Sequence, residues 1–209
     1  TANSESTDAV WTLYGSGRLI IRGQAGGETL KLAGDHAIDA SASASLTLDG
    51  VTLINLCTAN NPETVLGSLT IKNSTVLGLG EITCSNIIID GGSVDLDVPA
   101  GTTVRDSKGN ELKKVALKFT ETNTAVDNIQ ISDLPSGTTF DSSRLSTDTS
   151  GGLYLWIPKD ATIETVTIGG KTYYPKADGN VTTGDAPEFT GPSNDTSLIA
   201  ERNKVYPEL

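Results

Sequence analysis

Three short phrases in the first half of the chain share one pattern of apolar and polar positions. They read Leu46-Thr-Leu-Asp-Gly-Val-Thr-Leu53, Leu69-Thr-Ile-Lys-Asn-Ser-Thr-Val76 and Ile87-Ile-Ile-Asp-Gly-Gly-Ser-Val94. Each phrase opens on an apolar-x-apolar segment, and this spacing turns one face of a β-strand toward a core. Each phrase closes on Leu or Val, which returns to that core. The pattern therefore predicts pairs of short strands in each phrase.

The two strands of each phrase are separated by a residue that tolerates an unusual backbone conformation. Gly50, Asn73 and Gly91 occupy equivalent positions in the three phrases. Gly and Asn enter the left-handed region of backbone space at low energetic cost. We therefore predict a sharp bend at each of these residues.

The phrase recurs after 23 and then 18 residues, a step that suits one coil of a parallel β-solenoid. Two weaker copies lie upstream, Leu30-Lys-Leu-Ala-Gly34 and Leu19-Ile-Ile-Arg-Gly23. The step of 16 from Leu30 to Leu46 suits a tight coil. The step of 11 from Leu19 to Leu30 is too short for a coil and favours a hairpin or an entry strand.

Stacked coils would place one charged column just before the bends, with neighbours roughly 5 Å apart. The predicted column contains Arg22, Ala33, Asp49, Lys72 and Asp90. One interpretation is a carboxylate pair of a polysaccharide-cleaving β-helix. The favoured interpretation is a solvated charge ladder with Lys72 as its middle member, because opposite charges attract across strands and stacked carboxylates repel.

The segment Trp11–Ile21 has two strand-like runs around Gly15-Ser16-Gly17 and predicts a β-hairpin. Its aromatic residue allows two interpretations. Trp11 and Leu13 would cover the open end of the solenoid, since terminal coils need a cap. The alternative is that Trp11 is exposed for ligand stacking.

From Val115 the repeated phrase disappears and strand-like runs of varied length follow. Gly169-Gly170 suits a two-residue hairpin turn. We predict an all-β chain with a flexible leader (1–10), a β-solenoid domain (11–114), a small antiparallel β module (115–184) and a C-terminal extension (185–209). The segment of this extension that starts at Asp195 suits a short helix or a last strand. The predicted strands of the second module are Val115–Phe119, Ile129–Ile131, Leu153–Ile157, Thr165–Ile168 and Thr172–Tyr174.

The composition narrows the classes of function. The chain has a formal charge of −11 and a pI of about 4.4, so its surface repels the phosphate backbone of nucleic acids. No apolar run reaches the length of a membrane span. The chain begins at Thr1 and contains no Met. We expect a mature product, exported by a signal peptide that is not present in this chain.

Few residues are candidates for catalysis, metal binding or disulfide formation. Cys57 and Cys84 are the only cysteines, and either a disulfide or two small buried thiols is consistent with them. His36 is the only histidine and is interpreted as a surface residue, since it cannot form a metal cluster alone. Asp106–Glu111 is interpreted as a turn, because its spacing does not match a calcium loop. We predict no metal site and no cofactor.

Aromatic residues near turns are the best candidates for binding. Tyr154, Trp156, Tyr173 and Tyr174 are predicted as a ligand-binding set, because aromatic faces stack on sugar rings and tyrosine adds a polar group. The competing interpretation is core packing, since Tyr154 and Trp156 share one face of a strand.

Three parts of the chain carry further recognisable phrases: Trp11-Thr-Leu with Gly17-x-Leu19-x-Ile21-x-Gly23, the repeat at Leu46, and Gly152-Leu-Tyr-Leu-Trp-Ile-Pro158 with Val166-Thr-Ile-Gly-Gly-Lys-Thr-Tyr173. These phrases resemble those of secreted bacterial β-helix or β-solenoid surface proteins of the cell-adhesion type. The resemblance covers much of residues 11–175 and implies an extracellular location on a bacterial cell surface. It carries over no catalytic residue.

Two hypotheses of function follow. The first is a non-enzymatic structural or adhesive protein, expected to be monomeric, that binds a neutral surface glycan or a protein partner. The second is a glycan-active β-helix enzyme, a hydrolase or lyase, that uses Asp49 or Asp90 on the solenoid face. Paired carboxylates are common in an acidic β protein, so Asp90, Asp95 and Asp97 carry little weight alone.

Overall fold

The computed structural model describes residues 11–23, 28–33, 37–57 and 65–174. In these ranges the chain forms fourteen β-strands and no helix, so the predicted all-β class is confirmed. Within the same ranges no helix is long and apolar enough to cross a membrane. The predicted leader, His36 and the extension from residue 185 lie outside the described residues. The chain divides into two compact units, Thr1–Leu112 and Lys113–Leu209.

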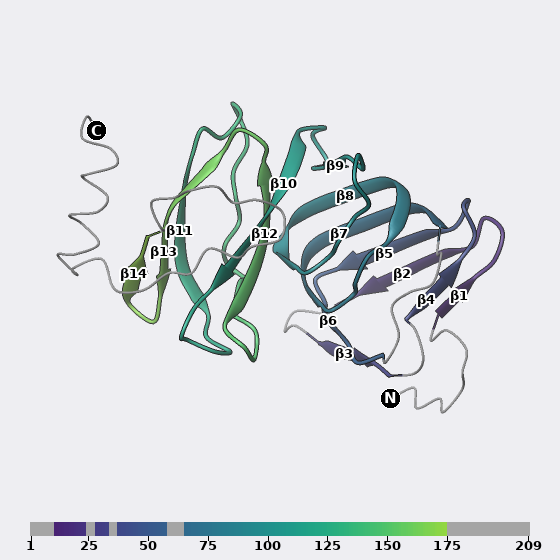
Figure 1. Ribbon diagram of the computed structural model, residues 1–209, viewed down its shortest axis with the longest axis horizontal. Coiled ribbons are helices and arrows are strands. Elements are labelled where there is room, and N and C mark those ends of the chain that lie inside the picture. The colour runs from purple at the N-terminus through teal and green to yellow at the C-terminus, as the bar shows by residue number, and fades with distance from the viewer. Residues whose placement is uncertain (1–10, 24–27, 34–36, 58–64, 175–209) are drawn as a thin grey trace. The chain divides into compact units, whose positions relative to one another are not determined.

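The first unit is built mainly on parallel strands (Figure 1). Four of them, β2, β5, β7 and β8, lie side by side in that order. β3 pairs in parallel with β6, and β6 pairs with the end of β7. The strands are β1 (Trp11–Leu13), β2 (Arg18–Arg22), β3 (Thr29–Leu32), β4 (Ile38–Ala40), β5 (Ser45–Asp49), β6 (Thr52–Asn55), β7 (Val65–Leu77), β8 (Thr83–Val94) and β9 (Val104–Arg105).

The three repeated phrases pair in the register that their sequences predict. Leu46 lies opposite Leu69, and Leu69 lies opposite Ile87. A second column, two residues further along each strand, joins Leu48, Ile71 and Ile89. All six side chains are at most 2% exposed. These two aliphatic columns form the core of the first unit beneath β5, β7 and β8.

The predicted bends are also confirmed. Gly50, Asn73 and Gly91 have φ angles of 67°, 43° and 73°, which lie in the left-handed region. The buried side chain of Ser74 supports the middle bend, because its Oγ donates to Lys72 O (2.7 Å) and accepts from Val51 N (3.2 Å). β7 and β8 therefore continue through their bends, and each contains both strands of its phrase.

One of the two upstream copies was assigned to the wrong half of the repeat. Leu19 lies opposite Leu46, whereas Leu30 lies opposite Leu53. The Leu30 phrase therefore corresponds to the second half of the repeat and not to its first half. Ala33 consequently has no place in the charged column, because Arg22 pairs directly with Asp49.

The predicted hairpin over Trp11–Ile21 is also wrong. β1 pairs in parallel with β4, and β2 pairs in parallel with β5. The turn itself is present, with Gly17 N donating to Tyr14 O (3.0 Å). An isolated two-stranded hairpin is only marginally stable, whereas β2 in its observed register extends the aliphatic columns of the stack.

The second unit has antiparallel pairing, so the sheets of the molecule are mixed. β11, β13 and β14 form a three-stranded antiparallel sheet, and β12 is the neighbour of β10. The core of this unit includes Leu117, Leu153, Leu155, Val166 and Ile168. All five strands predicted here are present, as β10 (Glu111–Lys118), β11 (Val126–Ser132), β12 (Gly152–Pro158), β13 (Thr162–Ile168) and β14 (Lys171–Tyr173).

The turn between β13 and β14 matches its prediction. Gly169 and Gly170 have φ angles of 56° and 74°, and Ile168 pairs with Lys171 across them. Two successive positive φ angles are the requirement of a tight two-residue hairpin turn. Gly170 N also donates to Asp127 Oδ2 (2.8 Å), which fastens the turn to β11.

Substitutions at Gly92 and Gly101 would test how closely neighbouring strands approach each other at the bend of β8. Gly92 and Gly101 share a φ of 86°, but a Cβ at Gly92 would lie 2.0 Å from Ser74 O, whereas one at Gly101 meets nothing within 4 Å. Gly101→Ala should cost about 1–2 kcal/mol of unfolding free energy from backbone strain alone. Gly92→Ala should cost roughly 1–3 kcal/mol more, because the strands must separate. Denaturant melts of the two variants measure the difference, and equal losses would contradict the packing at Ser74.

Candidate functional site

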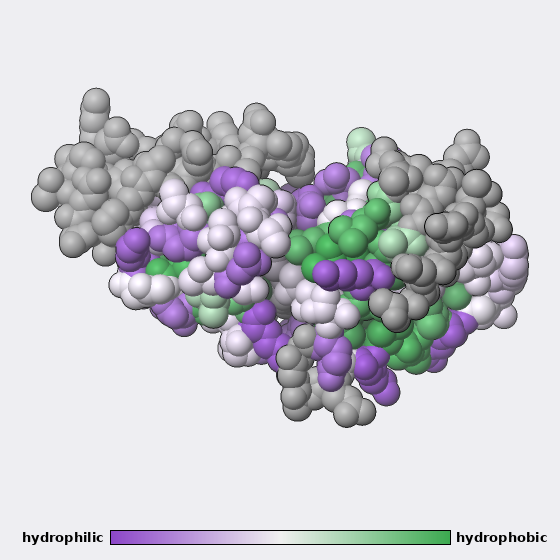
Figure 2. Space-filling model, turned by 90° about the horizontal axis from the view of Figure 1, so that it is seen from below, coloured by the Kyte–Doolittle hydropathy of each residue, from purple (hydrophilic) through white to green (hydrophobic). Residues whose placement is uncertain are grey.

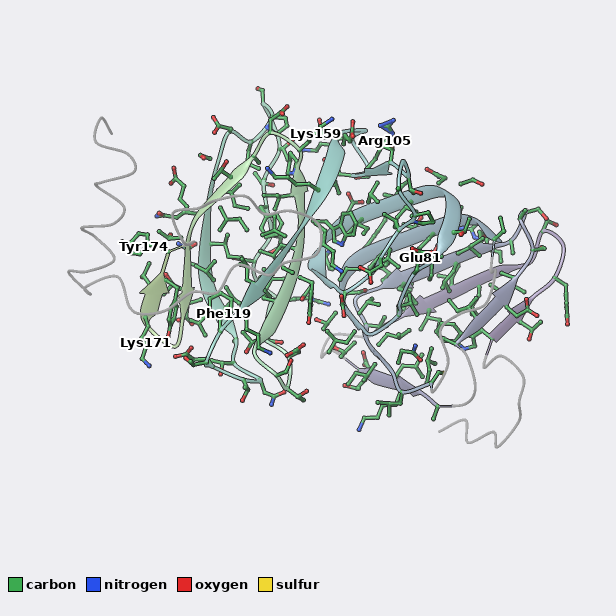
Figure 3. All side chains as sticks on the ribbon, in the orientation of Figure 1. Glu81, Arg105, Phe119, Lys159, Lys171 and Tyr174 are labelled. Atoms are coloured by element: carbon green, nitrogen blue, oxygen red, sulfur yellow. The ribbon has the colours of Figure 1, made fainter. Side chains whose placement is uncertain are left out.

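Glu121 is the centre of a polar cluster in the second unit. Tyr173 Oη donates to Glu121 Oε1 (2.5 Å), and Lys171 Nζ donates to the same oxygen (3.2 Å). Thr120 Oγ1 donates to the other carboxylate oxygen (2.8 Å). The ring of Tyr173 packs edge-on against Phe119, with centroids 5.5 Å apart. Figure 3 shows Phe119 and Lys171 toward the same end of the second unit.

The local environment lowers the pKa of Glu121 and raises the pKa of Tyr173. Burial acts to raise the pKa of Glu121, but the hydrogen bonds from Tyr173, Thr120 and Lys171 outweigh it and lower that pKa to about 2. Burial, followed by the bond to the Glu121 carboxylate and its charge, raises the pKa of Tyr173 to about 12. Glu121 is therefore ionised and Tyr173 neutral at neutral pH. Neither group is suited to exchanging protons with a substrate there.

Tyr154 already has protein partners on both its ring and its hydroxyl. Lys114 Nζ lies 5.5 Å from the centroid of its ring, within the range of a cation–π contact. Its hydroxyl is 3.5 Å from Asp148 Oδ2, a long and weak hydrogen bond. Asp148 Oδ1 accepts stronger bonds from Ser150 N (2.7 Å) and Gly152 N (2.7 Å), so this carboxylate organises the turn that precedes β12.

Burial divides the four predicted aromatic residues. Trp156 is 7% exposed and Tyr173 is 4% exposed, so neither offers an open ring face for stacking on a sugar. The prediction of a binding role for these two does not agree with their burial. Tyr154 and Tyr174 are half-buried and keep part of their rings accessible. The structure does not bring all four together as one exposed platform, because β12 is buried on both faces.

The charged column of the first unit alternates in sign. In register, Arg22 lies opposite Asp49, Asp49 opposite Lys72, and Lys72 opposite Asp90. Arg22 Nε and Asp49 Oδ2 are 3.5 Å apart, with 70% and 38% of the two side chains exposed. Asp90 Oδ1 accepts from Ser107 N (2.8 Å). Because Lys72 stands between them, Asp49 and Asp90 are two strand spacings, roughly 10 Å, apart.

The remaining candidate residues are the two cysteines, Asp97 and the turn at Asp106. No disulfide joins Cys57 and Cys84. Burial raises the pKa of Cys84, which makes its reactive thiolate form rarer. Asp97 and Glu81 form an isolated parallel backbone bridge. No group of three or more His, Cys, Asp and Glu side chains that could hold a metal ion occurs among the described residues. The Asp106 carboxylate accepts from Lys108 N and Asn110 N, as a turn requires.

Comparison with known proteins identifies no relative. No protein-family model matches the chain, and neither a curated protein nor a solved structure matches it.

The charge column gives a testable consequence. Lys72→Glu would place three carboxylates in consecutive positions and should lower the unfolding free energy by about 0.5–2 kcal/mol at low salt. Added salt should reduce this loss, because Lys72 is exposed and its two neighbours are only half-buried. Lys72→Arg is the matched control and should leave stability unchanged. Thermal melts at two salt concentrations measure both effects, and a salt-independent loss would contradict the electrostatic account.

The Glu121 cluster predicts a pH dependence. Because the pKa of Glu121 is depressed in the folded state, its contribution to stability is present above the unfolded pKa near 4.5 and is lost as pH falls toward 2. Because the pKa of Tyr173 is raised, its contribution is present below pH 10 and is lost as pH rises toward 12.

Melting temperatures of the wild type and Glu121→Gln, measured from pH 2 to 8, test this dependence. The difference between the two proteins should be largest above pH 5 and should shrink as the solution is acidified. Tyr173→Phe, which keeps the ring against Phe119, separates loss of the hydroxyl from loss of packing. A difference that is constant over this pH range would overturn the assignment.

Proposed function

We propose that this chain is a non-enzymatic structural or adhesive module of an extracellular surface protein. The observation that carries the proposal is the alternating charge column. Its carboxylates lie beside Arg22 and Lys72 and are separated from each other, an arrangement that supports a stable outer face rather than a carboxylate pair for cleaving glycans. The resemblance of the repeated phrases to bacterial surface proteins supports the location.

Within the all-β class, we propose a parallel β-solenoid as the architecture that serves this function. Its support comes from the in-register stacking of β5, β7 and β8 and from the bends at Gly50, Asn73 and Gly91. Stacked coils would give a long, regular and rigid outer surface. Such a surface suits a protein that displays or bridges partners more than one that must close around a substrate.

The outer face of the parallel strands supports binding through neutral polar groups. Ser45 lies opposite Ser68, and Thr47 lies opposite Thr70, on the side of the sheet away from the aliphatic columns. Adjacent members of each row are roughly 4.8 Å apart. These hydroxyl groups provide hydrogen-bonding partners for a neutral glycan or a protein. In the second unit, the half-buried Tyr154 and Tyr174 are separate candidates for such contacts. The net charge of −11 disfavours anionic ligands.

The glycan-active enzyme remains the alternative from another class. It would use Asp49 or Asp90 as its acid or nucleophile. Two carboxylates roughly 10 Å apart, with a lysine between them, are farther apart than the spacing of a retaining enzyme and close to the upper limit of an inverting one.

A screen of neutral glycans and extracellular proteins at about 50 mM and about 500 mM salt tests the proposal. We expect weak binding that changes less than about twofold, or strengthens, as salt rises, because the contacts do not depend on bulk charge. Tyr174→Ala should weaken glycan binding if the end of β14 takes part, whereas Tyr173→Phe should leave it unchanged. Binding that collapses with salt would refute the charge argument. Glycan cleavage that disappears in Asp49→Asn or Asp90→Asn would establish the enzyme instead.

A further inference from the structure

The aliphatic columns of the first unit end abruptly at β2. Leu46 and Leu48 of β5 are at most 1% exposed, but their register partners Leu19 and Ile21 on β2 are only half-buried. Ile20, on the outer face of the same strand, is 39% exposed. Among the described residues, the inward-facing side chains thus change from buried on β5 to half-buried on β2. Figure 2 shows that apolar surface is accessible on one face of the first unit.

The backbone of β2 also has an open edge. Gly23 N donates to Asp49 O (2.9 Å), and Ser45 N donates to Gly17 O (2.9 Å). In a parallel pair the groups that face one neighbour alternate along the strand. The N–H and C=O groups of residues 17, 19, 21 and 23 thus face β5, and those of Arg18, Ile20 and Arg22 face the opposite edge. Among the described strands none pairs with that edge.

The charges on β2 restrict what this edge accepts. The side chain of Arg22 is 70% exposed although it lies beside Asp49. The charge column alternates in sign from Arg22 through Asp49 and Lys72 to Asp90. An acidic residue on a strand added to the open edge of β2 would therefore continue this alternation beside Arg22. A second copy is disfavoured, because antiparallel pairing of β2 with itself about Ile20 places Arg18 opposite Arg22 of the other copy. Like charges directly opposite each other destabilise a strand pair.

We propose that the open edge of β2 binds an extended segment of a partner protein with the sequence pattern apolar-x-apolar-acidic, which adds to the sheet in parallel. The inference rests on the proposed function as a binding module and names its partner class. The apolar residues of the segment cover Leu19 and Ile21, and its carboxylate lies opposite Arg22. Main-chain bonds supply affinity and the alternate side chains supply specificity, as in other cases of strand addition.

The sequence of β5 and β6 provides the probe, because β5 already pairs with β2 in this pattern. A synthetic peptide of residues Ser45–Leu53, with blocked ends and a fluorescent label, should bind the full chain in an anisotropy titration. Ile20→Pro removes an N–H from the open edge and leaves the bonds to β5 intact. It should weaken binding at least about tenfold, whereas the matched control Ile20→Thr should remain within about twofold. Melting curves establish that both variants are folded.

A charge exchange tests specificity independently of the proline. Replacing the aspartate of the peptide by lysine should weaken binding to the wild type roughly three- to tenfold, and Arg22→Glu should reverse the preference. Absence of peptide binding, equal binding by Ile20→Pro and Ile20→Thr, or an unchanged preference would each overturn the proposal. Self-association of the wild type that Ile20→Pro abolishes would identify a second copy as the occupant instead. Glycan turnover would remove the proposed function but would not affect the peptide result.

Discussion

The register of the aliphatic columns is the constraint on which the first unit depends. Most of its strands are short, so little stability comes from any one of them, and the core forms where Leu46, Leu69 and Ile87 lie over one another. A shift by one residue would turn each of these side chains toward solvent, since the side-chain period of a strand is two. Once this register is set, Asp49 must lie opposite Lys72, and the bends at Gly50 and Asn73 must coincide. The charge column and the bends thus follow from packing.

The sequence predicted the pairing of three phrases because two independent signals agree there, the period-two alternation and the Gly or Asn at the bend. The signals disagree upstream. Leu30-Lys-Leu matches either half of the repeat, and only its pairing with Leu53 distinguishes them. The turn around Gly15 was recognised, but a turn does not determine whether its flanking strands pair with each other. Long-range parallel pairing with β4 and β5 prevailed over the local hairpin.

The candidate site was harder to predict than the fold, because exposure depends on both faces of a strand. Alternation in β12 suggested one buried pair and one open pair, yet Trp156 is buried together with Leu153 and Leu155. Glu121 belongs to no motif, and its bond to Tyr173 joins residues 52 positions apart. Only the antiparallel hairpin of β13 and β14, whose turn was predicted correctly, brings Tyr173 near that carboxylate. Local pattern thus located the strand, and tertiary packing determined the partner.

The two edges of the parallel sheet, at β8 and at β2, differ in how they are paired. At one end β8 pairs with the short strand β9 at Ile87 and Ile88, and β9 pairs antiparallel with the start of β10, so part of that edge is covered. At the other end β2 carries Arg18 and Arg22, in a chain with a net charge of −11. Charged residues on an edge strand oppose uncontrolled association of identical edges. The same two arginines leave the edge compatible with acidic strands, so one feature accounts both for avoiding self-pairing and for selecting a partner.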